Sequence, residues 1–417
     1  MKLFELKQKI QEYQYMEDTD IISVSMASVL ATRLKLGDPV WMVVVGPSSG
    51  GKSQILRPIA QTDEKFIHRI DDLTENTLLS GGIVAGGKDV SLLNKVGPMG
   101  ILVISDLTVI FSKSKDSQAA ILGQIRMVYD GEMTKYVGNK PEPLKWKGSL
   151  GVLAGCTPSV YTHFETVADM GERFIFYRMK DNDAEKATRL SLGRAVYGKE
   201  LDQKLSDLYA EYIKAVMADV DVDQIKFNPT IYERFIRISV LAEKIRTVAH
   251  VTWKDGTIDR IPVAAMPMRV ALQLMSIAKG LAVMRYHETG SYELIEEDLR
   301  CIDWCAYSLA NEEKRAILKI LCSVEKGVFV KTQIIADKIG LDTSIVRVIL
   351  QNMSATGVLE RTGNTEGLMW KIKDDNDYYT IRRIEGVDNS VDISDRALSQ
   401  EEAEESKLII DKLFDEF

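Results

Sequence analysis

Short apolar runs alternate with helical patterns through the first half of the chain, and helical spacing dominates most of the second half. The clearest runs are Trp41–Val45, Gly100–Ile104 and Gly151–Ala154. Runs this short and this apolar are typical of strands buried on both faces. Because helical segments separate them, the pattern predicts an α/β fold with a mainly parallel sheet.

The same pattern predicts the elements between these runs. We expect two helices within residues 1–36, further strands at His68–Ile70 and 170–177, and a capped turn at Asp71–Glu75 that opens a helix. The segment 117–129 and most of 183–310 are expected to be helical.

A glycine-rich segment follows the first apolar run directly. Its sequence, GPSSGGKS, fits the phosphate-binding pattern G-x-x-x-x-G-K-[ST], with a buried strand before it and a helix after it. The glycines let consecutive backbone N–H groups face one anion, and the helix adds the positive end of its dipole. Lys52 is expected to reach the β- and γ-phosphates of ATP, and the Ser53 hydroxyl to ligate Mg²⁺. The predicted nucleotide-binding residues are Gly46, Pro47, Ser48, Ser49, Gly50, Gly51, Lys52, Ser53 and Gln54.

A carboxylate ends the second clear run. Asp106 follows Gly100–Ile104 about fifty residues after the phosphate-binding loop, which is where a Walker B strand carries the acid that serves Mg²⁺. We therefore predict Asp106 as a metal and catalytic residue.

A basic hairpin is predicted beyond residue 130. Alternating polarity, a Gly-Asn turn and a following Pro-Leu-Lys-Trp-Lys segment favour two paired strands. The lysines of this hairpin either form a solvated edge or contact the DNA backbone. The candidate DNA-binding residues are Lys135, Lys140, Lys145 and Lys147.

Residues 311–373 show the order of a winged helix-turn-helix. Helices are predicted at 313–324, 331–339 and 344–356, followed by strands at 358–361 and 368–372. Such modules bind DNA or protein. The strongly acidic segment 374–417 is expected to be a mostly disordered tail with a short terminal helix, which either adds solubility or docks a partner through Phe414 and Phe417.

Composition narrows the choice of function. The chain has 417 residues, of which 45% are hydrophobic and 27% charged, as in a globular protein. The four cysteines and four histidines show no metal-ligand spacing, which argues against a zinc site. The first residues predict an amphipathic helix rather than a signal peptide, so a cytoplasmic location is expected. A net charge of −8 opposes DNA binding by the chain as a whole, although a local basic surface can act within an acidic protein.

The order of these parts resembles the AAA+ ATPases, and within them the helicase-type branch that includes the MCM replicative helicases. The chain looks like a compact form of the kind that phages and mobile elements carry, and the resemblance covers roughly residues 38–373. It implies five segments: an N-terminal helical segment 1–37, a nucleotide-binding core 38–182, a helical lid 183–310, a winged helix domain 311–373 and the acidic tail 374–417.

The resemblance also implies roles for single residues. Thr157 stands where the family has sensor 1, which places the attacking water. Arg173 stands where the family has an arginine finger, which enters a neighbour's ATP site, and Arg269 matches sensor 2 at the start of the lid helix. The alternative for either arginine is a structural salt bridge.

One position departs from the family pattern. The family's Walker B strand usually ends in Asp-Glu, whereas this chain has Ser105-Asp106. Either Asp106 serves both the metal and the water, or the base comes from elsewhere, with Asp71, Asp72 and Glu75 as candidates.

The resemblance implies an ATP- and Mg²⁺-dependent DNA translocase or helicase that works as a homo-oligomeric ring, expected to be a hexamer, with single-stranded DNA in its channel. A replication protein could dock on the winged helix or tail. Two alternatives remain open: a helicase-loading or protein-remodelling ATPase, and an initiator in which ATP controls assembly on DNA.

Overall fold

The structure is a computed structural model, and it describes residues 1–63, 65–80, 91–137, 142–163, 173–194, 198–218, 220–247, 266–363, 367–374, 376 and 378–386. By internal packing the chain forms two compact units. The first holds 1–226 and 272–302, and the second holds 227–271 and 303–417. This division groups the five predicted segments differently, because the N-terminal helices pack with the sheet and residues 183–310 are shared between the units.

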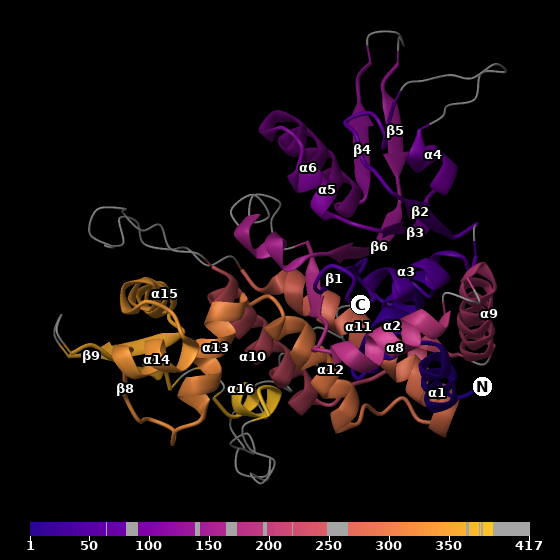
Figure 1. Cartoon of the computed structure of the whole chain (residues 1–417). Helices are drawn as coiled ribbons and strands as arrows, with labels where there is room; N and C mark the ends of the chain where they lie inside the picture. Colours follow the sequence, from indigo (N-terminus) through magenta and orange to yellow (C-terminus); the bar gives the residue numbers. More distant parts are fainter. Residues whose placement is uncertain are drawn as a thin grey trace. The chain divides into compact units, whose positions relative to one another are not determined.

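A five-stranded parallel sheet forms the centre of the first unit and confirms the predicted α/β class. Its order is β2-β3-β6-β1-β7 (Figure 1). The strands are β1 (Trp41–Val45), β2 (Ile67–Ile70), β3 (Met99–Ile104), β6 (Ser149–Cys156) and β7 (Ile175–Arg178). β1, β3 and β6 are buried along nearly their whole length, as the unbroken apolar runs predict.

Helices flank this sheet. They are α1 (Leu3–Tyr13), α2 (Asp20–Arg33), α3 (Lys52–Ala60), α4 (Leu92–Val96), α5 (Thr108–Phe111), α6 (Lys115–Tyr129), α8 (Ala184–Arg194) and α9 (Gly198–Met217), with 3₁₀ turns at Pro158–His163 and Val222–Gln224. The two predicted N-terminal helices are confirmed as α1 and α2, and the predicted helix 117–129 as α6. The helix predicted to open at Asp71–Glu75 is absent from residues 71–80, which form turns.

α2 is enclosed on every side. Each residue from Ile21 to Thr32 is buried, so this helix belongs to the core rather than to a surface layer. Two glycines permit the close packing around it. A Cβ at Gly280 would lie 2.2 Å from the Ala27 carbonyl oxygen, and a Cβ at Gly151 would lie 2.5 Å from Thr32 Oγ1.

The predicted hairpin is present as an antiparallel ribbon of β4 (Glu132–Lys135) and β5 (Leu144–Lys147), which runs away from the sheet beside α6 (Figure 1). Met133, Leu144 and Trp146 are buried on its inner face. Trp146 Nε1 donates to the Gly97 carbonyl at 2.8 Å, which ties the base of the ribbon to the chain before β3.

The second unit combines helices with a small antiparallel sheet of order β8-β10-β9. Its elements are α10 (Pro229–Arg246), α13 (Glu312–Cys322), β8 (Val330–Lys331), α14 (Thr332–Ile339), α15 (Thr343–Ala355), β9 (Leu359–Thr362), β10 (Met369–Ile372) and α16 (Tyr378–Ile384). α11 (Met268–Thr289) and α12 (Glu296–Tyr307) contribute residues to both units. The helices and strands predicted for 311–373 are therefore present, while the name winged helix stays a prediction.

The predicted disordered tail begins too early. Residues 378–384 form α16, in which Ile381 is fully buried and Arg383 pairs with the buried Asp303 carboxylate at 2.7 Å. Arg234 shares that carboxylate at 2.5 Å. The acidic composition of the whole segment predicted disorder, and a helix of only seven residues is too short to give a clear periodic pattern against it. The terminal segment with Phe414 and Phe417 lies outside the described residues.

Candidate functional site

The phosphate-binding loop joins β1 to α3, as predicted. Gly51 caps the helix at φ +95°, a left-handed conformation that glycine adopts at little expense. A Cβ at Gly50 would lie 3.0 Å from the Pro47 carbonyl oxygen, so the loop also needs a small residue there. Ser49 adopts φ +62° without being a glycine. The loop is thus curled tightly at the positive end of α3.

Lys52 lies across this loop. Its Nζ donates to the carbonyl oxygens of Gly46 at 2.8 Å and Pro47 at 2.7 Å. Burial lowers the pKa of Lys52, and the negative charge of Asp106 opposes that change. The Lys52 ammonium and the Asp106 carboxylate therefore share one electrostatic environment, although Lys52 begins α3 and Asp106 follows β3.

The carboxyl ends of three strands bring the predicted residues to one edge of the sheet. β6 lies between β1 and β3, with Val45 opposite Cys156 and Ile104 opposite Ala154. Thr157 and Asp106 therefore emerge at the level of the loop. Two strand spacings separate β1 from β3, or about 10 Å, which leaves room for phosphates between Lys52 and Asp106. The chain also changes direction across the sheet at β1, the kind of position where open α/β sheets bind ligands.

Thr108 links Asp106 to Thr157, and sequence reasoning missed it. Asp106 Oδ1 accepts from the Thr108 N–H at 2.9 Å. Thr108 Oγ1 lies 3.4 Å from the Thr157 nitrogen and 3.5 Å from its hydroxyl. The Asp-Leu-Thr sequence is an available signal, since an aspartate often accepts from the N–H two residues later. Thr157 Oγ1 also lies 2.7 Å from Ser159 Oγ, so both hydroxyls of the edge are oriented.

The three alternative bases are engaged in other contacts. Asp71 accepts from Ser105 Oγ at 2.8 Å and from Arg69, and these hydrogen bonds lower its pKa. Asp72 pairs with Lys113 at 2.9 Å, and Glu75 accepts from Ser117. All three lie in the turns that follow β2, at the far side of β3 from the phosphate-binding loop. Asp106 is thus the carboxylate best placed for the loop.

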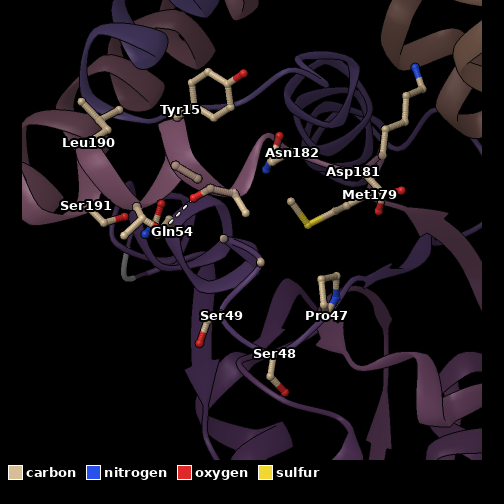
Figure 2. A pocket seen from close by; sticks show the side chains of 16 residues that line it. Tyr15, Pro47, Ser48, Ser49, Gln54, Met179, Asp181, Asn182, Leu190 and Ser191 are labelled. Carbon is tan, nitrogen blue, oxygen red and sulfur yellow. Dashed lines mark hydrogen bonds between the residues drawn. The ribbon is translucent and has the colours of Figure 1, made fainter.

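A pocket of about 280 Å³ adjoins the loop. Figure 2 shows Tyr15, Met179, Asn182 and Leu190 around it, together with side chains of the loop such as Pro47. Its lining comes from the phosphate-binding loop, the connection between α1 and α2, and the chain from β7 into α8. Sequence reasoning missed these walls, because residues so far apart in sequence carry no common pattern.

Buried hydrogen bonds hold the pocket walls together. Asp18 is 4% exposed, and the Tyr177 hydroxyl donates to its two carboxylate oxygens at 2.8 and 3.0 Å. Burial, together with the charge of Asp18, raises the pKa of Tyr177. Gln14 Nε2 donates to the Gln54 carbonyl at 2.7 Å, and Asn182 Oδ1 accepts from the Glu17 N–H at 3.0 Å. The N-terminal segment is therefore fastened to both α3 and the end of β7.

Arg173 makes the salt bridge that the sequence left open as an alternative. The residue is 6% exposed, and its Nη2 contacts both oxygens of Asp130, at 2.8 and 2.9 Å. The guanidinium also lies 5.5 Å from the centre of the Tyr129 ring. Arg173 precedes β7 and so lies at the opposite edge of the sheet from the loop, about 16 Å away along a five-residue strand. A finger directed at another molecule would first have to leave this pair.

The remaining predicted residues stand apart. Arg269 lies in the first turn of α11 and groups with the second unit, so its γ-phosphate contact stays a prediction.

Among the hairpin lysines, Lys140 lies outside the described residues. Lys135 faces the body of the first unit, where its Nζ donates to the Glu75 carbonyl at 2.8 Å and to Asn76 Oδ1 at 3.1 Å. Lys147 forms an exposed pair with Glu132, and Lys145 is exposed.

The donor set fits Mg²⁺ only together with phosphates. Among the described residues no group of three or more His, Cys, Asp or Glu could hold a metal. Mg²⁺ commonly takes one or two protein oxygens and completes its octahedron with phosphate and water. Ser53, exposed at the start of α3, and Asp106 are suitable donors for that arrangement.

No protein-family model matches the chain, and no curated protein matches it in sequence. None of the described helices is long and apolar enough to cross a membrane.

Proposed function

We propose that this chain is an ATPase that moves along single-stranded DNA as a homo-oligomeric ring, and that it belongs to the AAA+ class. The observation that carries the proposal is the shared edge of the sheet, where the phosphate-binding loop, Asp106 and Thr157 follow three neighbouring parallel strands. A loop of this form binds the phosphates of a nucleoside triphosphate. A carboxylate and a hydroxyl at the same edge add what hydrolysis needs beyond binding.

Each residue has a distinct task in this scheme. Lys52 exchanges its loop carbonyls for phosphate oxygens, and its charge offsets the negative charge that develops during phosphoryl transfer. Bound Mg²⁺ would supply further neutralisation, with Ser53 and Asp106 as its protein-side oxygens. Asp106 orients and deprotonates the attacking water, and Thr157 fixes the position of that water through its hydroxyl. Through its hydrogen bonds to both residues, Thr108 holds Asp106 and Thr157 in fixed positions relative to each other.

The pocket beside the loop would take the nucleoside. Tyr15, Met179 and Leu190 offer apolar surface to a base, while Asn182 and Ser191 offer hydrogen bonds. The mixture of apolar walls and few polar groups is usual for cofactor pockets. This arrangement explains why the N-terminal segment is fastened to the sheet so firmly.

The β4–β5 ribbon would contact DNA. It projects from the same unit that holds the loop, and Lys145 and Lys147 are exposed along it. Lysines bind phosphate backbone without regard to sequence. The exposed Lys147–Glu132 pair is weak enough to open for a phosphate.

A set of assays on the full chain tests the proposal. ATP hydrolysis should require Mg²⁺ and rise when single-stranded DNA is added, and a forked duplex should be separated. Lys52→Ala should abolish nucleotide binding, whereas Lys113→Ala, which removes a lysine of the same unit that pairs with Asp72, should leave it intact. Absence of nucleotide binding by the wild-type chain would refute the ATPase assignment. Nucleotide binding with no effect of DNA on hydrolysis would refute the translocase assignment alone.

A protein-remodelling or helicase-loading ATPase is the second candidate. One observation favours it: Ile334, Leu341 and Ile345, on α14, at the turn after it and on α15, are 45%, 37% and 52% exposed. Helix α15 would be the recognition helix of the predicted winged helix, and apolar residues at its exposed start suit a protein surface better than a phosphate backbone. Hydrolysis stimulated by a protein but unaffected by DNA would favour this candidate.

A further inference from the structure

Tyr136 lies directly after β4, and the lysines of the β4–β5 ribbon do not account for its exposure. Tyr136 follows β4 and is 80% exposed, the highest value among the large hydrophobic residues that the structure describes. A tyrosine ring so exposed gains nothing for the fold of the chain. The position of Tyr136 directly after β4 therefore indicates a role in binding.

The register of the ribbon sets the neighbours of Tyr136. Thr134 pairs with Lys145, and Glu132 with Lys147, on the outer face, while Met133 and Trp146 pair on the buried inner face. Alternation along β4 places Tyr136 on the same outer face as Thr134, diagonal to Lys145. The outer face thus presents an aromatic ring, Lys145 and the exposed Lys147–Glu132 pair in sequence. The contacts of Lys135 and Trp146 with the body of the unit hold this face in a fixed direction.

We propose that Tyr136 is a base-stacking residue and that the outer face of the ribbon binds single-stranded nucleic acid in preference to duplex. An exposed ring stacks on an unpaired base, and adjacent lysines hold the backbone, which is how sequence-independent single-strand sites are built. In a duplex the bases already stack on one another, and only phosphates meet the lysines. A polypeptide could also contact a tyrosine, but Lys145 and Lys147 favour a polyanion. This inference rests on the proposed function and specifies the substrate of its ribbon.

Binding measurements with the full chain and a non-hydrolysable ATP analogue test the inference. The probes are a fluorescent oligothymidylate, an abasic strand of equal length, and labelled casein as an unfolded polypeptide. Wild type should bind the oligothymidylate more tightly than the abasic strand. Tyr136→Ala should weaken oligothymidylate binding roughly 5- to 150-fold and leave abasic binding unchanged, because stacking contributes about 1–3 kcal/mol per base. Tyr136→Phe should keep the preference, and Phe4→Ala, which removes a ring 66% exposed in the same unit, should not alter it.

Each other outcome counts against the inference. Equal oligothymidylate affinities for wild type and Tyr136→Ala would overturn it while leaving the proposed function standing. Loss of casein binding in Tyr136→Ala, with DNA binding intact, would assign the ring to a polypeptide. If wild type binds neither strand, the DNA assignment of the proposed function fails as well. Thermal unfolding of each variant separates these results from misfolding, since removal of so exposed a ring should leave the melting temperature unchanged.

Discussion

Gly155 on β6 is a position where one added methyl group should slow the proposed ATP hydrolysis without removing a catalytic side chain. A Cβ there would lie 2.7 Å from the Ser105 carbonyl oxygen and 3.3 Å from Leu56 Cδ1. The Gly155 carbonyl also accepts from the Leu107 N–H at 2.7 Å. Asp106 is therefore held between two residues that both contact Gly155. Backbone atoms cannot rotate away as a side-chain end can, so Gly155→Ala must push the end of β3 outward.

The size of this displacement sets the expected effects. Ordinary contact between Cβ and a carbonyl oxygen begins near 3.4 Å, so relief of a 2.7 Å contact requires a shift of about 0.7 Å. Overpacking of this kind lowers the free energy of unfolding by about 1–3 kcal/mol. A catalytic group moved by about 1 Å can reduce turnover about a hundredfold, so a ten- to hundredfold lower kcat is expected. Nucleotide affinity should change little, because the loop follows β1 and the contact with α3 involves only the end of the Leu56 side chain, which can move aside.

Gly151→Ala is the matched control. It lies on the same strand, and its Cβ would meet Thr32 Oγ1 at 2.5 Å, far from the nucleotide edge. Both variants should show a lower urea midpoint, but only Gly155→Ala should lose turnover in steady-state ATPase assays at saturating ATP. Equal turnover in the two variants would refute the reasoning that Gly155 positions Asp106.

Three further predictions follow from buried groups. Asp303→Asn should lower the free energy of unfolding by about 3–5 kcal/mol in urea titrations, because the fully buried carboxylate serves two arginines; an unchanged midpoint would contradict this. Burial raises the pKa of Cys156 from 9.0 to about 11, so the unfolded thiol ionises first and stability should fall between pH 9 and pH 11 by up to about 3 kcal/mol, a loss that Cys156→Ala should remove. Arg173→Ala and Asp130→Ala should both lower the free energy of unfolding in urea titrations if the pair is structural. Recovery of hydrolysis on mixing Arg173→Ala with Lys52→Ala subunits would instead reveal a finger acting between subunits.

Local patterns made the sheet and the phosphate-binding loop predictable. Buried parallel strands read as unbroken apolar runs, and the loop follows one of them with its glycines at fixed spacing, so both could be placed from sequence. The position of Asp106 after β3 was predictable for the same reason, while its metal and catalytic role stays a prediction. Thr108, by contrast, acts through a turn that brings Asp106 and Thr157 together across two strands, and only the short Asp-Leu-Thr sequence hints at it.

Contacts between residues far apart in the sequence could not be predicted from local patterns. The walls of the pocket unite the N-terminal segment with β7 and the chain after it, through Asp18 and Tyr177, which share no motif. A basic residue before a strand also has two possible partners, a phosphate or a nearby acid, and composition does not choose between them. In the structure Arg173 pairs with the nearby Asp130 carboxylate. Similarly, α16 depends on a few buried residues within an acidic segment.

The complete burial of α2 affects how fragments of this chain should be designed and how its sequence should be aligned. A fragment that starts at the strand before the phosphate-binding loop would leave out a helix with no solvent-facing side between Ile21 and Thr32. Such a fragment would expose the apolar surface that α2 covers and would aggregate rather than fold as a transplantable module. The N-terminal helices are thus part of the core of the first unit, and sequence alignments that begin at the glycine-rich loop discard a piece of that core.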